Sequence, residues 1–426
     1  MTILFFISVA IIVYAYLLYP AIIVVWASLF PRRVEKRYRH VPVSVVIAAR
    51  DEDKNISARL ENLLAQEYPR ALLEVIVVSD GSADRTADLA RQFASHGVNV
   101  IECSSPVGKA AALNIGVASA SHGIVVFADA RQRFSPNAIA ELVSVFHDET
   151  VGAVSGELIL VSGDEAGEVH EGVGLYWKYE KLIRRSESAV ASVVGATGSI
   201  YAVRRRLYQP LEPNTLLDDF LVPMRIVLAG YRVIFIRAAR AFDLSSPTAK
   251  REFARKVRTL AGNFQAVAME PRLLSIRANP VLFQFVSHKI LRLVVPYCCV
   301  AAWVTSALLP GPLYAAAFAL QTLFYGLGIL NLTPLRTSPV ATLFRISWTF
   351  IVLNAAAVVG LWVFVTRQER MVWRKTVGTA VRPGQSLVGD VQASPALRIY
   401  FPGVPASMIQ VETRGKRVAK KIFDCH

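Results

Sequence analysis

A short apolar run, VSVVIAA at residues 43–49, is followed at once by the polar residues Arg50-Asp51-Glu52. Its length and its β-branched side chains are typical of a strand that is buried on both faces. Two similar runs follow at residues 73–79 and 123–128, with helical patterns between them. Because strands that alternate with helices form mainly parallel sheets covered by helices on both faces, residues 41–278 are predicted to be an α/β domain.

Acidic residues stand at the carboxyl end of each predicted strand. Glu52 follows the first strand, Asp80 the second and Asp129 the third. In α/β sheets, ligands bind beyond the carboxyl ends of the strands, so these carboxylates are expected to converge on one crevice. A single acid in such a place is usually a helix cap or a turn residue, and a cap is at least as good an explanation for Asp84. Three acidic strand ends in succession favour a ligand site.

The chain is apolar as a whole, with 54% hydrophobic residues and a mean hydropathy of +0.41. Residues 3–29 carry no charge, and at ~1.5 Å per residue they can cross a ~30 Å hydrocarbon core. Basic residues between positions 32 and 39 place the following domain in the cytoplasm by the positive-inside rule. Three more spans are predicted, after a charged stretch at residues 281–292 that suits a helix lying in the interface. These spans are residues 293–309, 313–332 and 346–366.

The side of the membrane on which the C-terminus lies stays open. One span before the domain and three after it put the tail outside, but basic residues at 367–375 and 414–421 favour the cytoplasm. The predicted organisation is an N-terminal span with its basic segment (1–40), the α/β domain (41–278), an interfacial helix with about three spans (279–376) and a basic tail (377–426).

The formal net charge of +15 indicates anionic partners. No recognition motif accompanies this charge, so nucleic acid is not expected, and membrane lipids are the preferred partner. The four cysteines have the spacing of neither a zinc site nor a disulfide framework; they are Cys103, Cys298, Cys299 and Cys425.

Taken in chain order, the motifs between residues 41 and 265 resemble those of family 2 glycosyltransferases with the GT-A fold. The matching segments are Val43–Glu52, Val77–Ser82 with Asp84, Gly108–Gly116, Phe127–Ala130, Gly195–Ser199, Asp218-Asp219 followed by Gly230-Tyr231, and Arg251–Phe253 leading into Arg255–Arg258. The flanking spans resemble those of bacterial membrane synthases that make extracellular polysaccharides. The resemblance implies a Rossmann-like, mainly parallel catalytic domain on the cytoplasmic face of a bacterial inner membrane, in a multi-pass protein.

The resemblance also implies a nucleotide-sugar donor, and a UDP-sugar is expected. It places four residues around the base and ribose: Ala48, Arg50, Glu52 and Asp80. Around the diphosphate it places Lys109, Asp129, Arg131 and Arg258. On position alone, Lys109 could equally be a solvated surface lysine.

A divalent ion, Mg²⁺ or Mn²⁺, is the cofactor that the resemblance implies. Asp129 matches the first acid of the Asp-x-Asp motif of the family, which holds the ion against the diphosphate. The second acid is replaced by Arg131, which could itself neutralise the diphosphate. The sequence therefore predicts weaker metal dependence than is usual in the family.

Asp219 is the candidate catalytic base, preceded by Asp218. Inverting sugar transfer needs one base to take the proton of the acceptor hydroxyl, and the resemblance assigns this carboxylate to Asp219. A like charge next to it could raise the pKa toward working pH. The alternative is an ordinary helix N-terminus, where paired acids are common.

The acceptor side is assigned to Gly198, Trp177 and Arg255. Arg255 and Arg258 fall where processive members carry Gln-x-x-Arg-Trp, but Thr259 takes the place of the tryptophan, which weakens the case for processive polymerisation. A basic helix on anionic lipid is the alternative for this segment. Trp177, with the nearby Tyr176 and Tyr179, is at a spacing that more often indicates core residues.

The function expected first is a hexosyl- or N-acetylhexosaminyltransferase that extends an extracellular or cell-envelope polysaccharide. Two alternatives stay open: transfer of one sugar to a polyprenyl phosphate or other lipid-linked acceptor, and a degenerate domain that binds nucleotide sugars as a scaffold. The partners expected are the nucleotide sugar, a glycan or lipid-linked acceptor, membrane lipids and other components of polysaccharide export.

Overall fold

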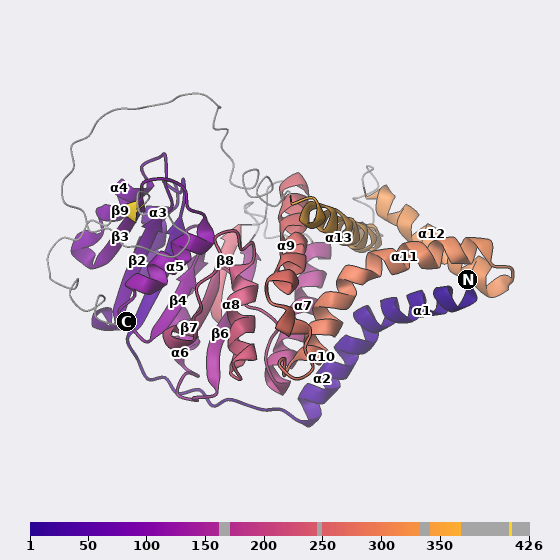
Figure 1. Cartoon of the computed structure of the whole chain (residues 1–426), viewed down its shortest axis with the longest axis horizontal. Coiled ribbons are helices and arrows are strands. Elements are labelled where there is room, and N and C mark those ends of the chain that lie inside the picture. Colours follow the sequence, from indigo (N-terminus) through magenta and orange to yellow (C-terminus); the bar gives the residue numbers. More distant parts are fainter. Residues whose placement is uncertain (162–170, 245–248, 332–340, 368–408, 411–426) are drawn as a thin grey trace.

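A twisted sheet forms the centre of the α/β domain, and a group of long apolar helices lies to one side of it (Figure 1). This computed structural model describes residues 1–161, 171–244, 249–331, 341–367 and 409–410. In these residues the sheet has nine strands in the order β5-β8-β6-β7-β4-β1-β2-β3-β9. The strands are β1 (Val43–Ala49), β2 (Leu73–Ser79), β3 (Val98–Cys103), β4 (Ile124–Ala128), β5 (Arg133–Phe134), β6 (Val151–Val161), β7 (Ile200–Arg204), β8 (Arg232–Leu244) and β9 (Ile409–Gln410).

The middle of the sheet is parallel, as predicted. β1 pairs in parallel with β2 and with β4, and β2 pairs in parallel with β3. β7 runs antiparallel to both of its neighbours, β4 and β6. The three predicted strands are β1, β2 and β4, and the predicted α/β fold with a parallel central sheet is confirmed. Their adjacency brings three acidic strand ends to one edge of the sheet.

Each face of the sheet is covered by its own helices, because successive side chains of a strand point to opposite faces. Val46 of β1 packs on the side of α5 and α8, whereas Val45 and Ile47 pack on the side of α3 and α6. These side chains are wholly buried, which stabilises the fold by roughly 1.5–3 kcal/mol each. The covering helices are α3 (Ile56–Leu64), α4 (Thr86–Arg91), α5 (Lys109–Ser119), α6 (Ala138–Val143) and α8 (Asp218–Leu228).

Four helices are long and apolar enough to cross a membrane: Thr2–Leu29, Leu282–Leu308, Pro312–Leu330 and Thr342–Val365. The first consists of α1 (Thr2–Val13), a π-helical turn (Tyr14–Leu18) and α2 (Tyr19–Leu29). The second consists of α10 (Leu282–Phe285), a π-helical turn (Val286–Ile290) and α11 (Leu291–Leu308). The others are α12 (Pro312–Leu330) and α13 (Ala341–Val365).

The stretch at residues 281–292, expected to be a separate interfacial helix, is instead continuous with α11. Phe285 and Val286, where α10 meets the π-helical turn, keep right-handed helical dihedral angles, so the backbone does not break there. Of the three residues that suggested an interfacial position, His288 is 2% exposed and contacts Glu180 and Glu187 of α7, whereas Lys289 and Arg292 are half-buried. A charged side chain can lie inside such a helix when a neighbouring element supplies its partners.

Two helices connect the domain to the apolar helices: α7 (Glu171–Val190) and α9 (Ala249–Met269). Ile183 and Val190 of α7 form an apolar cluster with Tyr19 and Ile23 of α2. α9 packs on α13 through Val257, Ala261, Ala356 and Val363. α7 and α9 lie between the sheet and the apolar helices (Figure 1). Short 3-10 turns at Arg70–Leu72, Ala94–His96, Arg205–Leu207 and Pro271–Leu274 complete the described elements.

Candidate active site

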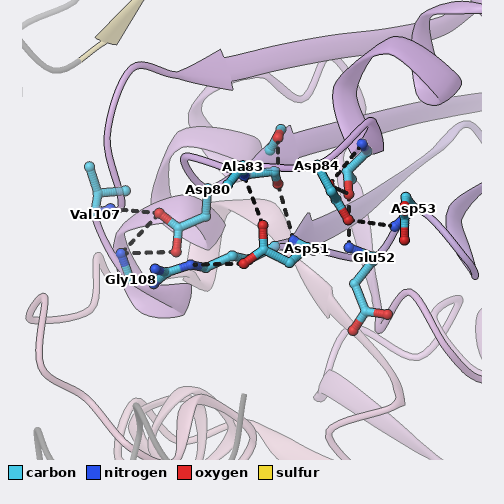
Figure 2. Close-up of polar contacts among 12 residues, drawn as sticks. Asp51, Glu52, Asp53, Asp80, Ala83, Asp84, Val107 and Gly108 are labelled. Atoms are coloured by element: carbon cyan, nitrogen blue, oxygen red, sulfur yellow. Dashed lines mark hydrogen bonds and ion pairs between the residues drawn. The ribbon is translucent and has the colours of Figure 1, made fainter. Parts of the chain in front are cut away.

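The loops that follow β1 and β2 are tied together by hydrogen bonds (Figure 2). The Ala83 N–H donates to Asp51 Oδ1 at 2.8 Å, and the Asp53 N–H donates to Asp84 Oδ2 at 3.0 Å. Asp51 has a φ of +52°, a left-handed conformation that a residue other than glycine seldom adopts. Asp84 also accepts the N–H of Thr86, the first residue of α4, at 2.9 Å, so it does act at a helix start.

Asp80 shapes the next loop. Its carboxylate accepts the N–H of Val107 at 2.6 Å and that of Gly108 at 3.1 Å, and the residue is 2% exposed (Figure 2). Burial raises the pKa of Asp80, and the two N–H donors offset part of this rise. Gly81 has a φ of +57°, and a Cβ there would lie 2.4 Å from the nitrogen of Pro106. Asp80 and Gly81 together hold the segment that leads into Lys109.

Lys109 brings two of the predicted acids together. Its Nζ lies 3.1 Å from Asp129 Oδ1 and 3.3 Å from Asp218 Oδ1. Burial would lower the pKa of Lys109, but the charges of Asp129, Asp218 and Asp219 outweigh burial and raise it. The ammonium group is therefore fixed in its charged form in the middle of the acids, and the alternative of a solvated surface lysine is wrong.

Asp218 and Asp219 are the first residues of α8, so the helix dipole acts on both. Burial, together with the charge of Asp218, raises the pKa of Asp219 to about 6, while Lys109 and Arg258 oppose the rise. Gly198 lies against this carboxylate, because a Cβ at Gly198 would come 2.7 Å from Asp219 Oδ2. The absence of a side chain at Gly198 thus makes room for the Asp219 carboxylate itself, whose pKa is suited to taking up a proton near neutral pH.

Arg184 of α7 positions this glycine, and the sequence analysis did not identify it. Its guanidinium donates to Thr197 Oγ1 at 3.0 Å and to Ser155 Oγ at 2.9 Å. The Thr197 N–H also donates to Ser155 Oγ at 2.9 Å, which closes a small network directly before Gly198. The sequence offered only a weak indication of this role, namely an arginine next to the buried residue Ile183 on an amphipathic helix.

The other residues predicted to bind the nucleotide-sugar donor lie around the ends of β1 and β4. Arg131 Nε lies 3.6 Å from Glu52 Oε1, and the Arg131 side chain is 67% exposed. Arg50 Nε lies 3.9 Å from Asp51 Oδ2, and Ala48 packs against the buried cluster on the α5 side. Burial raises the pKa of Glu52, and the hydrogen bond from Asn55 and the charge of Arg131 oppose this.

The carboxylates around Lys109 provide only part of a binding site for a divalent ion. Within the described ranges no group of three or more His, Cys, Asp or Glu side chains could hold a metal ion. The Asp129 side chain is 34% exposed and could contribute one carboxylate, with further oxygens from a diphosphate. In the second position of the motif stands Arg131, which interacts with Glu52. The residues thus fit an ion held by one protein carboxylate and a phosphorylated ligand.

Two of the three residues predicted to bind the acceptor substrate are contacted by side chains of α9. Lys256 Nζ lies over the rings of Tyr176 and Trp177, at 5.4 and 5.7 Å from their centroids. Arg255, expected near the acceptor, forms an ion pair with Glu252 at 2.5 Å. Arg258 acts on Asp219 by its charge, and Gly198 lies against that residue. Trp177 and Arg255 are thus engaged by neighbours on α9, whereas Gly198 and Arg258 belong to the crevice.

Part of the chain is similar to known glycosyltransferases. Residues 44–209 match the family described as "Glycosyl transferase family 2". The chain is 26% identical over 234 residues to a "Probable glycosyltransferase YdaM" of Bacillus subtilis, covering 52% of this chain and 55% of that protein. It is 25% identical over 234 residues to a "Poly-beta-1,6-N-acetyl-D-glucosamine synthase" of Staphylococcus aureus, covering 53% of this chain and 55% of that protein. The chain spans about half the length of the curated relatives it matches.

Among solved structures, the fold is similar to that of a "Mannosyltransferase PcManGT from Pyrobaculum calidifontis in complex with GDP-Man and Mn2+". The TM-score is 0.67 at 23% sequence identity, and the match covers 86% of this chain and 99% of that one. The likeness in fold therefore extends beyond residues 44–209.

Proposed function

We propose that the chain is a glycosyltransferase that transfers a sugar from a nucleotide-diphosphate donor to an acceptor held beside the membrane. The match of residues 44–209 to the glycosyl transferase family 2 and the likeness in fold to a solved mannosyltransferase support this. The observation that carries the proposal is the crevice in which Lys109 contacts Asp129 and Asp218, next to an Asp219 whose pKa is raised to about 6. A fixed cation suits a diphosphate, and a carboxylate with a raised pKa suits a general base.

The transfer proceeds as a single displacement. The acceptor oxygen forms a bond to the anomeric carbon while the bond from that carbon to the diphosphate oxygen breaks, and the electron pair stays with the diphosphate. The proton of the acceptor hydroxyl passes to Asp219. Lys109 and Arg258 stabilise the charge that develops on the diphosphate. One displacement inverts the configuration at the anomeric carbon.

The donor side follows from the loops after β1 and β2. Asp80 acts through the backbone: it holds Val107 and Gly108 so that Lys109 faces the acids. Arg50 and Glu52 lie at the end of β1, where a base and a ribose can be contacted. A UDP-sugar is the donor we propose first. A divalent ion, when bound, helps to neutralise the diphosphate, and Asp129 would hold it.

The acceptor is proposed to be a glycan of the cell envelope, and the likeness to a polysaccharide synthase supports this. Single transfer to a lipid-linked acceptor is the second candidate, and one observation favours it: Thr259 stands where processive members carry a tryptophan. Product length separates the two, since a polymer supports the first candidate and one added sugar supports the second. The four apolar helices are proposed to span a bacterial inner membrane with the catalytic domain in the cytoplasm.

The test uses the full-length protein, purified in detergent and incubated with a panel of UDP- and GDP-sugars with and without Mn²⁺. We expect release of the nucleotide diphosphate with one donor of the panel, and loss of this release in Asp219→Asn. The exposed pair of Glu149 with Arg206 provides a matched control, Glu149→Gln, which should release the nucleotide at the original rate. Absence of release with every donor would leave a scaffold that binds nucleotide sugars and would overturn the proposal.

A further inference from the structure

The loop that leads into α8 is held by a side chain of α9. Gln265 Oε1 accepts the N–H of Leu216 at 2.9 Å, and Gln265 Nε2 donates to the carbonyl oxygen of Asn214 at 2.9 Å. A side-chain amide carries both an acceptor and donors, and here both ends of the amide bind the same loop. Because α8 begins at Asp218, this glutamine fixes the backbone directly ahead of the two acids.

The same loop lies at the surface before it enters the core. Residues 212–214 are exposed, whereas Leu217 and Asp218 are buried. Within the loop, the N–H of Thr215 donates to the carbonyl oxygen of Glu212 at 3.0 Å. Exposed segments with local hydrogen bonds open at a low cost in free energy, so a bond to a packed helix has a large influence on where such a segment ends.

The backbone of α9 also comes close to this loop. A Cβ at Gly262 would lie 2.5 Å from Leu217 Cγ and 3.2 Å from Leu216 Cβ. Glycine weakens the interior of a helix relative to alanine, so a glycine at this position has a cost that the close contact explains. Leu217 is the residue directly before α8, so the packing of α9 reaches the start of that helix.

Arg258, Gly262 and Gln265 lie on one face of α9, because residues three and four positions apart are neighbours on a helix surface. The charge of Arg258 opposes the rise in the pKa of Asp219. One face of α9 therefore acts on residues 214–219 in three ways: through a hydrogen-bonded amide, through close backbone packing and through a charge.

α9 has a fixed position from which to hold the loop, because it packs closely on α13. A Cβ at Gly360 would lie 3.0 Å from the nitrogen of Ala261, and the rings of Phe264 and Phe364 stack with centroids 6.1 Å apart. Small residues allow apolar helices to approach each other in this way. α9 thus connects a candidate membrane span to the loop before α8 (Figure 1).

We infer that Gln265 is a positioning residue for the sugar transfer. By holding residues 214–216 against α9, it keeps Asp218 and Asp219 where they meet the ammonium of Lys109. The inference rests on the proposed function, because it concerns the placement of the proposed base in that reaction. A displacement of about 1 Å can cost about 10²-fold in rate, so Gln265 should affect turnover more than binding of the nucleotide.

The first experiment measures turnover with a UDP-sugar and binding of UDP, both on the full-length protein in detergent. Gln265→Leu should lower kcat by about tenfold and leave the affinity and stoichiometry of UDP binding unchanged. Gln265→Glu keeps the acceptor for Leu216 but loses the donor to Asn214, so its kcat should lie between the two. Gln209→Leu is the matched control: this glutamine is exposed ahead of the same loop, and kcat should not change.

The second experiment reaches the same loop through packing. Gly262→Ala does not weaken α9, because alanine is the better helix former, but its Cβ meets Leu217 and should displace the start of α8. We expect kcat to fall about tenfold with UDP binding retained. Gly326→Ala is the matched control, since its Cβ would meet no atom of the described residues within 4 Å. Gly262→Ala and Gln265→Glu decide the matter if Gln265→Leu gives no folded protein.

Three results would overturn the inference: an unchanged kcat in the folded Gln265 and Gly262 variants, an equal fall in Gln209→Leu, or a loss of UDP binding as large as the loss of turnover. The last result would show that α9 supports the fold as a whole and has no special effect on the acids. Failure of the proposed function appears differently, as no nucleotide release by the original protein with any donor.

Discussion

Two groups of charges, one around Lys109 and one between α7 and the apolar helices, are balanced differently. In the proposed active site, the ammonium of Lys109 contacts both Asp129 and Asp218, and burial together with the charge of Asp218 raises the pKa of Asp219 to about 6. At the junction with the apolar helices, Glu180 and Glu187 clamp His288 between them, with Arg292 and Tyr19 as further partners.

This difference distinguishes a group of charges that can bind a ligand from a network that stabilises the fold. In the junction each carboxylate has partners at hydrogen-bond distance, so both acids are already engaged by residues of the chain. In the crevice the acids outnumber the ammonium that contacts them, so one carboxylate is poised to take up a proton and the group can accept further cations or donors. Completeness of partners is therefore more informative than burial or charge alone.

The largest effect is expected for Asp219→Asn, which removes the base from the crevice. Turnover should fall by about 10²–10⁴-fold, the usual contribution of general acid–base catalysis. The midpoint of thermal unfolding should stay the same or rise, because the substitution also removes repulsion from Asp218. Nucleotide release and thermal unfolding are measured on the same preparation. Turnover close to that of the original protein would show that Asp219 is not the base.

The matching change in the junction is Glu187→Gln, which should act on stability. Removing one partner from a buried ionic network costs about 3–5 kcal/mol, because His288 and Tyr19 keep their burial and lose the charged acceptor. Glu149→Gln, in an ion pair whose glutamate is 77% exposed, should cost less than about 1 kcal/mol. The free energy of unfolding is measured in detergent. Equal losses of this free energy in the two variants would show that the junction network does not stabilise the fold.

The pH dependence of turnover sharpens the comparison further. Asp219 must be ionised to act as a base, so the rate should fall as pH decreases through about 6 and level off above it. Lys109→Gln removes a charge that lowers the pKa of Asp219, so the midpoint should move up by about one pH unit. Lys36→Gln, which breaks an ion pair with Glu141 away from the crevice, should leave the midpoint in place. A midpoint that is the same in all three proteins would count against this assignment.

The smallest effect is expected for metal ions. With Asp129 as the protein carboxylate, the original protein should keep measurable turnover in chelator, and Mn²⁺ should stimulate it modestly. Arg131→Asp restores the second acid of the motif and should increase the stimulation by Mn²⁺, whereas Arg131→Asn removes the charge without adding a ligand and should not. Complete loss of turnover in chelator, restored only by Mn²⁺ or Mg²⁺, would refute weak metal dependence.

Much of the fold was predictable because it rests on local patterns. β1, β2 and β4 are continuous apolar runs in the sequence, and such runs are typical of strands that are buried on both faces. β3 and β8 were not predicted, because polar residues such as Asn99 and Arg237 interrupt their apolar runs, and the strands exist through pairing with distant neighbours. The helix predicted at residues 281–292 is continuous with α11 and not separate from it, and the partners of its His288 come from α7, far away in the sequence.

The sequence by itself determined the α/β class, the candidate spans and the acidic strand ends, because periodicity and chain order are local properties that persist into the fold. Only the tertiary structure decided that Lys109 joins Asp129 to Asp218, that Arg184 holds the loop before Gly198, and that His288 is clamped by acids about a hundred residues away. The physical reason is that pKa values and ion pairs depend on distances of a few ångströms between groups far apart along the chain. No local pattern encodes such distances.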